Sequence, residues 1–295
     1  MKKVMYALLA VIAVVACGCR RGGQEDPGVD VKARSPGARF LCVGMEVSAR
    51  FGACPGCSLD AERMTGLLRD KYGYEGHTLI SSQAIKSNVV KYLKEGIEST
   101  DENGLFIFCY SGHGGQEDLC GCIGGLSEPE GADSDDEYLC LYDTFLLDDE
   151  IWSILSRCRG RVMCVFDCCH SGTMYRSVKG DAVKEYLKTH PGSAVALEAQ
   201  DAEVKSTGFT FLKNKAIPMG SGTRLLSWSG CKETEYSFGS AAGGQMTNAL
   251  IGKWNDSMSY EMLWDAVYRE VQRVQPDQHP VRTVIGKGFE GAAFK

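Results

Sequence analysis

Two apolar runs that end abruptly in polar, reactive residues constrain the fold of this chain most strongly. Residues 162–166 are followed by Asp167-Cys168-Cys169-His170-Ser171-Gly172, and residues 105–110 by Ser111-Gly112-His113-Gly114-Gly115. Short apolar runs bounded by turn residues are typical of fully buried strands. In an open α/β sheet, ligands sit outside the carboxyl ends of the strands. The two runs therefore predict a buried sheet that brings thiols and an imidazole to one functional edge.

The rest of the chain alternates between strand-like and helix-like segments. Strands are predicted near 39–45, 76–80, 104–110, 138–142, 161–167, 223–229 and 281–285. Helices are predicted near 58–71, 83–97, 148–157, 241–254 and 259–274. This alternation favours an α/β fold with a mostly parallel sheet covered by helices on both faces. Segments 115–137, 174–221 and 230–243 are predicted to be long loops at the carboxyl edge, where function usually lies.

The first residues resemble an export signal rather than part of the fold. Residues 1–16 combine basic Lys2 and Lys3 with a short apolar segment, too short for the roughly 20 residues of a membrane-spanning helix. The segment ends in Val14-Val15-Ala16-Cys17, which resembles the lipobox of bacterial lipoproteins. Cleavage there would leave the Cys17 thiol for lipid attachment. The alternative is an ordinary secretory signal peptide cut near Ala16.

Residues 17–38 are polar and predict a flexible tether, so residues 39–295 are predicted to form the folded domain. Gly18 stands where an inner-membrane retention signal would have Asp. We therefore expect a lipid-anchored protein of the bacterial cell envelope, at the outer membrane or cell surface rather than the inner membrane.

Charge and cysteine content limit the partners. The formal net charge of −6 argues against nucleic acid and is compatible with a cationic substrate. Of the 14 cysteines, those inside apolar runs are expected to be buried core thiols: Cys42, Cys109, Cys140 and Cys164. Others would be available for disulfides in an exported protein, with a pairing that the sequence leaves open: Cys54, Cys57, Cys120, Cys122 and Cys158.

The two strand ends carry the groups of a nucleophilic enzyme. A thiolate is the reactive form of cysteine, and a neighbouring imidazole such as His113 can accept the thiol proton. Cys168 and Cys169 are both candidate nucleophiles on the residues alone. The backbone N–H groups of Gly114 and Cys169 are candidate donors to an oxyanion. His170 adjoins Cys169 but would point to the opposite face of an extended segment, so we interpret it as structural.

These motifs resemble those of caspase-like cysteine peptidases, and closest those of the metacaspase branch. The metacaspase pattern Asp-x-Cys-His-Ser-Gly fits residues 167–172 and makes Cys169 the nucleophile, while the Gln-Ala-Cys signature of animal caspases is absent. Later segments also resemble the family, so the resemblance covers about 39–290: Ser227 to Glu233, Gly244 to Thr247 and Gln278 to Pro280.

The resemblance implies a caspase-like three-layer αβα sandwich with a mostly parallel central sheet of about six strands. It also implies a cysteine endopeptidase that hydrolyses peptide bonds with a His113–Cys169 dyad through a thioester. The same Gly114 and Cys169 N–H groups would form the oxyanion hole. No cofactor is required for this chemistry.

A further motif concerns substrate specificity. Gly56-Cys57-Ser58-Leu59-Asp60-Ala61 resembles the metacaspase stretch that opens the first helix. The family places its equivalents of Cys57, Asp60, Ser111 and Asp167 in the S1 pocket. Two carboxylates there would favour Arg or Lys at P1. Alternatively, Asp60 caps its helix and Asp167 a turn. Arg50, in the same loop, leaves an acidic P1 residue as a minority interpretation.

Two regulatory features follow from the same resemblance. Many metacaspases depend on calcium, and Asp148 and Asp149 open a helix as the acids of those proteins do; an acidic run at 133–137 precedes them. The family pattern has an acidic residue where this chain has Arg176. Stabilisation by the helix dipole would equally explain acidic residues at the start of this helix. Segment 174–221 holds Arg176 and many lysines, which predicts either self-cleavage or a charged, solvated linker.

Two competing functions remain. Cys54 and Cys57 form a Cys-x-x-Cys at a helix start, which could serve a redox function or join Cys120 and Cys122 in a metal site. The chain could also be a non-catalytic caspase-fold lipoprotein that binds a partner. Our main prediction is a peptidase whose partners are a peptide or protein with a basic P1 residue and, through the anchor, a membrane.

Overall fold

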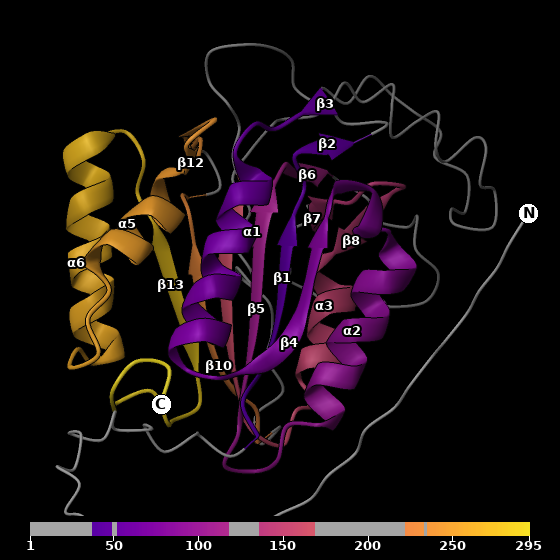
Figure 1. The fold of residues 1–295 in the computed structure, drawn as a ribbon, viewed down its shortest axis with the longest axis vertical. Coiled ribbons are helices and arrows are strands. Elements are labelled where there is room, and N and C mark those ends of the chain that lie inside the picture. Colours follow the sequence, from indigo (N-terminus) through magenta and orange to yellow (C-terminus); the bar gives the residue numbers. More distant parts are fainter. Residues whose placement is uncertain (1–36, 49–51, 118–135, 169–221, 233–234) are drawn as a thin grey trace, which may run out of the picture. The chain divides into compact units, whose positions relative to one another are not determined.

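A computed structural model of the protein describes residues 37–48, 52–117, 136–168, 222–232 and 235–295 (Figure 1). The predicted signal peptide, Cys17 and residues 18–36 of the predicted tether lie outside these residues, as do Arg50, Cys120, Cys122, Cys169, His170 and segment 174–221. The last residue of the predicted tether, Ala38, is buried and belongs to the folded domain. No helix in the described part of the chain is both long and apolar enough to cross a membrane.

The centre of the fold is a six-stranded sheet in the order β13-β10-β9-β5-β1-β4 (Figure 1). The strands are β1 (Arg39–Gly44), β4 (Glu75–Ile80), β5 (Leu105–Gly112), β9 (Arg161–Cys168), β10 (Arg224–Ser229) and β13 (Val281–Ile285). Neighbouring strands are parallel, except that β13 pairs antiparallel with β10. The predicted sheet of about six mostly parallel strands is confirmed.

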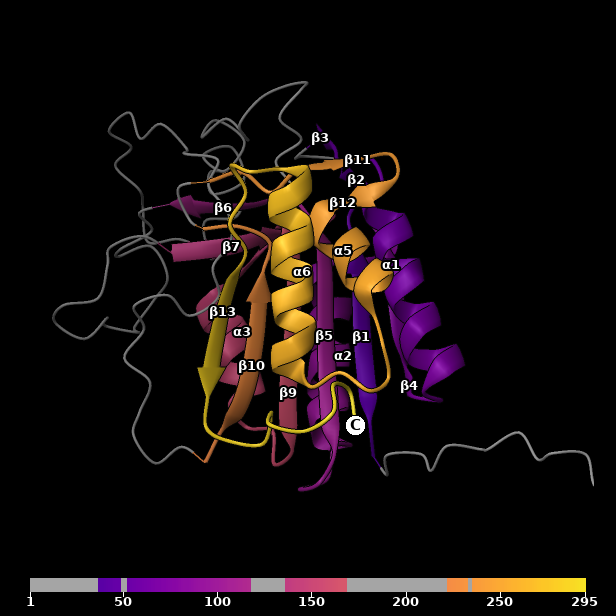
Figure 2. The same cartoon turned by 90° about the vertical axis from the view of Figure 1, so that its left-hand side faces the viewer.

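Helices cover both faces of this sheet, which confirms the predicted three layers (Figures 1 and 2). One face carries α1 (Cys57–Gly66), α5 (Gln245–Lys253) and α6 (Tyr260–Val274), and the other carries α2 (Lys86–Glu98) and α3 (Asp148–Leu155). A π-helical turn extends α1 to Lys71. Helix α6 begins after the N-cap residue Ser259, whose side chain accepts a hydrogen bond from the amide of Met262.

The central strands are apolar throughout because both of their faces are buried. On β5, Phe106, Phe108 and Tyr110 pack toward α2 and α3, while the alternate residues Leu105, Ile107 and Cys109 pack toward α1 and α5. Side chains of a strand alternate between faces, so a sheet covered twice needs apolar residues at every position. The thiols that were predicted to be core residues, Cys42, Cys109, Cys140 and Cys164, are all buried.

The strand predicted near 138–142 does not belong to the central sheet. It is β7 (Asp136–Cys140), which pairs antiparallel with β6 (Gly114–Glu117) and β8 (Phe145–Leu147) in a separate small sheet. Two further short hairpins are β2 (Val47–Ser48) with β3 (Gly52–Ala53), and β11 (Gly239–Ser240) with β12 (Gly243–Gly244). Helix α5 therefore begins at Gln245 and not at 241 as predicted, because residues 243 and 244 form strand β12.

Candidate active site

The ends of β5 and β9 lie side by side at the carboxyl edge of the sheet. Ser111 pairs in register with Asp167, and Gly112 pairs with Cys168. The next residue after β5 is His113, and the next after β9 is Cys169, which lies outside the described residues. The residues just before the two predicted catalytic positions, Gly112 and Cys168, are therefore paired directly. This agrees with the prediction that both strands end at one edge of the sheet.

The His113 loop is fixed by hydrogen bonds to its carbonyl oxygen. This oxygen accepts from the Tyr110 hydroxyl at 2.7 Å and from the Cys140 amide at 2.9 Å. The imidazole is half-buried, and its Nε2 lies 3.3 Å from the carbonyl oxygen of Ala53, in the β2–β3 hairpin. The imidazole thus stands between the strand edge and the loop that leads into α1.

Cys168, the last residue of β9, lies in the core. Its side chain is buried on the α2 and α3 side of the sheet. Burial raises the pKa of its thiol well above the ordinary value. A buried, protonated thiol is a poor nucleophile, so Cys168 has the character of a core residue.

Asp60 and Asp167 lie on the opposite face, and both are 1% exposed. Asp60 Oδ2 accepts a hydrogen bond from the Ser111 hydroxyl at 2.7 Å and from the amide of Gly244 at 2.9 Å. Asp167 accepts from the Ser237 hydroxyl at 3.0 Å and from the amide of Thr247 at 2.7 Å. The structure thus brings three of the four predicted S1 residues into one hydrogen-bonded group.

The start of α5 explains how two carboxylates can be buried together. The N-terminal amides of a helix have no partners within the helix and favour negative charge. Gly244 is the N-cap of α5 and Thr247 lies in its first turn, so the helix start donates one amide to each acid. The alternative in which Asp60 caps α1 is not supported by its bonds, which go to Ser111 and Gly244.

The carboxylates still carry an electrostatic penalty. Burial, and then the charge of Asp167, raises the pKa of Asp60 to about 8. Burial also raises the pKa of Asp167, while the bonds from Thr247 and Ser237 act in the opposite direction. Asp60 Oδ1 is buried and accepts no hydrogen bond from any described residue. The pair therefore has unused capacity for a cationic partner.

Access to the acids is restricted. A side-chain Cβ at Gly243 would lie 2.2 Å from Asp60 Oδ1, and one at Gly244 would lie 2.2 Å from Asp167 Oδ2. The cavity against Asp60, Ser111 and Thr247 measures about 10 Å³, which is roughly the space for one water molecule. Within the described residues, the β11–β12 hairpin therefore lies directly against both carboxylates.

Cys57, the fourth predicted S1 residue, is the first residue of α1 and is buried. Its sulfur lies 2.8 Å from that of Cys54. The charge interactions of Asp60, Asp167 and Cys168 all include Cys57. The thiol therefore sits beside the acidic pair rather than in a separate part of the fold.

The predicted calcium residues lie at the start of α3. Asp148 is fully buried and Asp149 half-buried. Within the described ranges, no group of three or more His, Cys, Asp or Glu side chains could hold a metal ion. Asp148 and Asp149 alone therefore do not make a calcium site.

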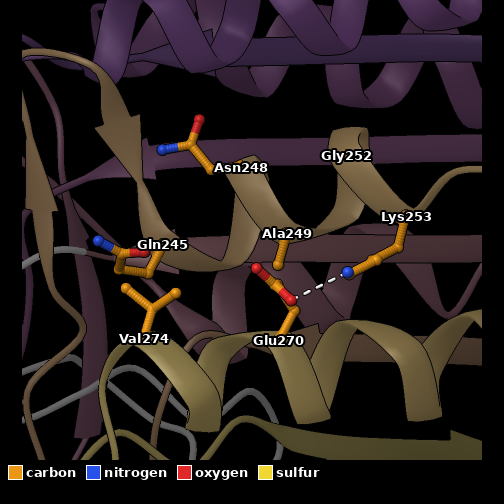
Figure 3. A pocket seen from close by; sticks show the side chains of 7 residues that line it. All are labelled: Gln245, Asn248, Ala249, Gly252, Lys253, Glu270 and Val274. Atoms are coloured by element: carbon orange, nitrogen blue, oxygen red, sulfur yellow. Dashed lines mark ion pairs between the residues drawn. The ribbon is translucent and has the colours of Figure 1, made fainter.

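A surface groove of about 300 Å³ lies between α5 and α6 (Figure 3). An ion pair of 2.9 Å between Lys253 and Glu270 spans it. Its lining residues include no cysteine or histidine, so this groove does not carry the thiol–imidazole chemistry: Gln245, Asn248, Ala249, Gly252, Lys253, Glu270 and Val274.

Sequence reasoning missed the residues that support the acids. Gln278 is fully buried; its Nε2 donates to Ser237 Oγ and to the carbonyl of Gly230, and its Oε1 accepts from the amide of Phe238. Ser237 in turn donates to Asp167. The family-like segment at 278–280 was a signal for Gln278, but nothing in it indicated this contact.

Comparisons with known proteins agree with the fold. The caspase domain model matches residues 42–285. Metacaspase-1A of Aspergillus fumigatus is 26% identical over 278 residues, which cover 79% of this chain and 65% of that protein. Metacaspase-1A of Aspergillus oryzae is 24% identical over 306 residues, covering 87% and 71%. The chain thus spans slightly less than two thirds of the length of the first of these relatives.

A solved structure from Geobacter sulfurreducens matches the same fold. It is 24% identical, has a TM-score of 0.63, and the match covers 88% of this chain and 98% of that one. The family model covers most of the chain, and its span includes both strand ends and the acidic pair. The chain therefore belongs to the caspase domain family of cysteine peptidases, with metacaspases as distant relatives.

Proposed function

We propose that this chain is a cysteine endopeptidase that cleaves after arginine or lysine, with Cys169 as nucleophile and His113 as general base. The observation that carries the proposal is the in-register pairing of β5 with β9, which ends one residue before each of these positions. A nucleophile and its base must come within hydrogen-bond reach of each other, and the pairing of these neighbouring strand ends supports such a placement.

The proposed reaction has two stages. His113 accepts the proton of the Cys169 thiol, and the thiolate attacks the carbonyl carbon of the scissile peptide. The N–H groups of Gly114 and Cys169 stabilise the oxyanion. The C–N bond then breaks, His113 protonates the leaving amine, and a thioester remains. A water molecule that gives its proton to His113 hydrolyses the thioester, which releases the acid and restores the thiol.

The acidic pair supports a basic P1 residue. Asp60 and Asp167 are buried together, and Asp60 retains an oxygen without a described hydrogen-bond donor. A guanidinium would offset one of the two negative charges and could donate two parallel hydrogen bonds to the pair. Ser111 and Cys57 complete the proposed S1 pocket. Because Gly243 and Gly244 cover the acids, the proposal includes an outward movement of this hairpin when substrate binds.

Calcium activation and self-processing are further parts of the proposal. Asp148 and Asp149 would contribute oxygen ligands, with other ligands from elsewhere in the chain, such as the acidic run at 133–137. The Arg- and Lys-rich segment 174–221 would be a substrate of the same active site. We also propose that Cys17 is lipidated and anchors the protein in the bacterial cell envelope, at the outer membrane or cell surface.

Peptides that differ only at P1 test the function. Purified full-length protein, with and without added calcium, should cleave the Arg and Lys peptides and leave the Ala and Asp peptides intact. Cys169→Ala should abolish cleavage, while Cys158→Ala, in the turn between α3 and β9, should keep it. Cleavage that survives Cys169→Ala, or a preference for the Asp peptide, would contradict the proposal.

The secondary proposals have separate measurements. A calcium chelator should lower the rate if calcium activates the enzyme. Intact mass spectrometry should show chain fragments ending in 174–221 for the wild type and a single uncut species for Cys169→Ala. A wild-type chain that stays whole under active conditions would end the self-processing proposal, and an unmodified Cys17 would end the lipid-anchor proposal.

A further inference from the structure

The turn Cys54-Pro55-Gly56-Cys57 brings two buried sulfur atoms into contact at the start of α1. They lie 2.8 Å apart, and each residue is 1% exposed. We propose that Cys54 and Cys57 are a redox modification site, whose reversible disulfide weakens the binding of basic substrates in the neighbouring S1 pocket. The effect of the disulfide on substrate binding rests on the proposed function, whereas the formation of the disulfide does not depend on it.

The backbone of the turn holds the two sulfur atoms close together. The amide of Cys57 donates to the carbonyl of Cys54 at 3.3 Å, and Gly56 has a left-handed φ of 91°. A disulfide has a sulfur–sulfur distance of about 2.05 Å, so the sulfurs need to approach by less than about 1 Å. A Cβ at Gly56 would lie 2.1 Å from the carbonyl oxygen of Ser240, so the turn is packed against the β11–β12 hairpin.

Both ends of this turn contact the candidate active site. Cys57 lies one helical turn before Asp60 on α1, and Asp60 is bonded to Ser111 and Gly244 of the candidate site. Cys54 follows Ala53, whose carbonyl oxygen lies 3.3 Å from His113 Nε2. Protein interiors are close-packed, so drawing the two sulfurs together shifts the start of α1 and its neighbours. Such a shift would misplace the groups that receive a P1 side chain.

The reaction requires an oxidant, and a small-molecule disulfide such as oxidised glutathione supplies it. Because both sulfurs are buried, the exchange proceeds from a locally opened state of the turn, in which one protein thiolate attacks this disulfide, gives a mixed disulfide and releases one thiolate. The second protein thiol loses its proton and attacks the mixed disulfide, which releases the second thiolate. Two electrons pass from the cysteines to the oxidant, and the two protons end on the released thiols. Excess dithiol reduces the protein disulfide by the same kind of exchange and is itself oxidised to a disulfide.

The experiment begins with full-length Cys169→Ala protein, which removes the proposed catalytic thiol from the chemistry. After equilibration in glutathione buffers, remaining thiols are alkylated and the protein is cut with trypsin. Peptide 51–63 contains Cys54 and Cys57 and no other cysteine. We expect it to lose two hydrogen atoms and escape alkylation in oxidising buffer. Full alkylation of both cysteines in the most oxidising buffer would overturn the proposal.

Calorimetry on the same protein measures the effect on substrate binding. We expect oxidation to weaken the binding of an Arg-terminated peptide by about tenfold, a loss typical of misplacing groups by part of an ångström, and dithiol to restore it. Cys54→Ser in this background should bind equally well in both buffers. An equal loss in Cys54→Ser, or no loss in the parent, would overturn the control of binding.

A failure of the proposed function can be distinguished from a failure of the redox proposal. If reduced wild-type protein cleaves no peptide after Arg or Lys, the basic-P1 specificity is wrong, and the control of binding falls with it. The mapping of peptide 51–63 then still decides whether Cys54 and Cys57 form the modification site.

Discussion

The buried hydroxyl of Tyr110 lies 2.7 Å from the carbonyl oxygen of His113 and 2.6 Å from that of Cys140. This single side chain therefore ties the loop after β5 to strand β7 of the small sheet. The contact fixes the backbone of His113 without touching its imidazole. Tyr110 is thus a positioning residue for the proposed base, reached from within the hydrophobic core.

Tyr110→Phe should loosen this loop while it keeps the packing of the ring. Removing the hydroxyl takes away the one proton that the His113 and Cys140 carbonyl oxygens share, so the free energy of unfolding should fall by about 1–3 kcal/mol. The kcat for an Arg peptide should fall with little change in KM, because the base and not the S1 pocket is disturbed. Tyr92→Phe on α2 is the matched control. A wild-type kcat in Tyr110→Phe would show that His113 does not need this bond.

The two adjacent thiols at the end of β9 should behave differently. Cys168 is buried and its thiol pKa is raised by burial, so Cys168→Ala should retain peptidase activity and cost about 1 kcal/mol of stability through lost packing. Rates of cleavage and urea unfolding curves measure the two effects. Loss of activity in a folded Cys168→Ala protein would instead identify Cys168 as the nucleophile.

The edge of the sheet could be predicted from the sequence because it depends on local pattern. The apolar runs of β5 and β9 are continuous, and polar residues mark where each ends. The grouping of Asp60, Ser111 and Asp167 could be expected only through the family resemblance, since Ser111 and Asp60 are 51 positions apart. Nothing in the local pattern of either segment indicates that their side chains meet.

The supporting contacts could not be predicted even so. Gly244 and Asp60 are 184 positions apart, and Gln278 lies in a stretch of Gln, Pro, Asp and His that is typical of an exposed loop. Its burial depends on partners from two other segments, Gly230 and Ser237. The strand predicted near 138–142 was wrongly expected in the central sheet for a related reason. Its pairing with β6 depends on tertiary structure, which the local sequence pattern does not indicate.

The acidic pair should make stability depend on pH. The pKa of Asp60 is raised from 3.8 to about 8, so the folded state holds a proton that the unfolded state has released between these values. Stability is therefore expected to fall as the pH rises from about 4 to 8, by at most about 1.4 kcal/mol per pH unit. Urea unfolding at pH 5, 6, 7 and 8 measures the slope. Asp60→Asn should flatten it, while the exposed Asp265→Asn should not.

The same ionisation should affect substrate binding in the opposite sense. Deprotonation of Asp60 adds the second negative charge that a guanidinium would neutralise, so KM for an Arg peptide should fall as the pH approaches 8. In Asp60→Asn this dependence should disappear. A KM for the wild type that is constant between pH 6 and 8 would argue against Asp60 as a reader of the P1 charge.

Alanine substitutions at Gly244 and Gly252 test whether the start of α5 holds the acidic pair. A Cβ at Gly244 would lie 2.2 Å from Asp167 Oδ2, so Gly244→Ala must displace the helix start or the carboxylate. Either shift weakens the bonds from Gly244 to Asp60 and from Thr247 to Asp167. We expect a loss of about 2 kcal/mol in stability, of the size found for overpacked sites, together with a higher KM for Arg peptides.

Gly252 is the matched control, because a Cβ there meets nothing within 4 Å and the residue lies inside α5. Gly252→Ala should raise stability by about 0.5–1 kcal/mol, since alanine loses less backbone entropy in a helix, and leave KM unchanged. Urea unfolding and initial rates compare the two variants directly. If Gly244→Ala is as stable and as active as Gly252→Ala, the start of α5 does not hold the acidic pair in the way described. The start of α5 would then have no part in substrate recognition.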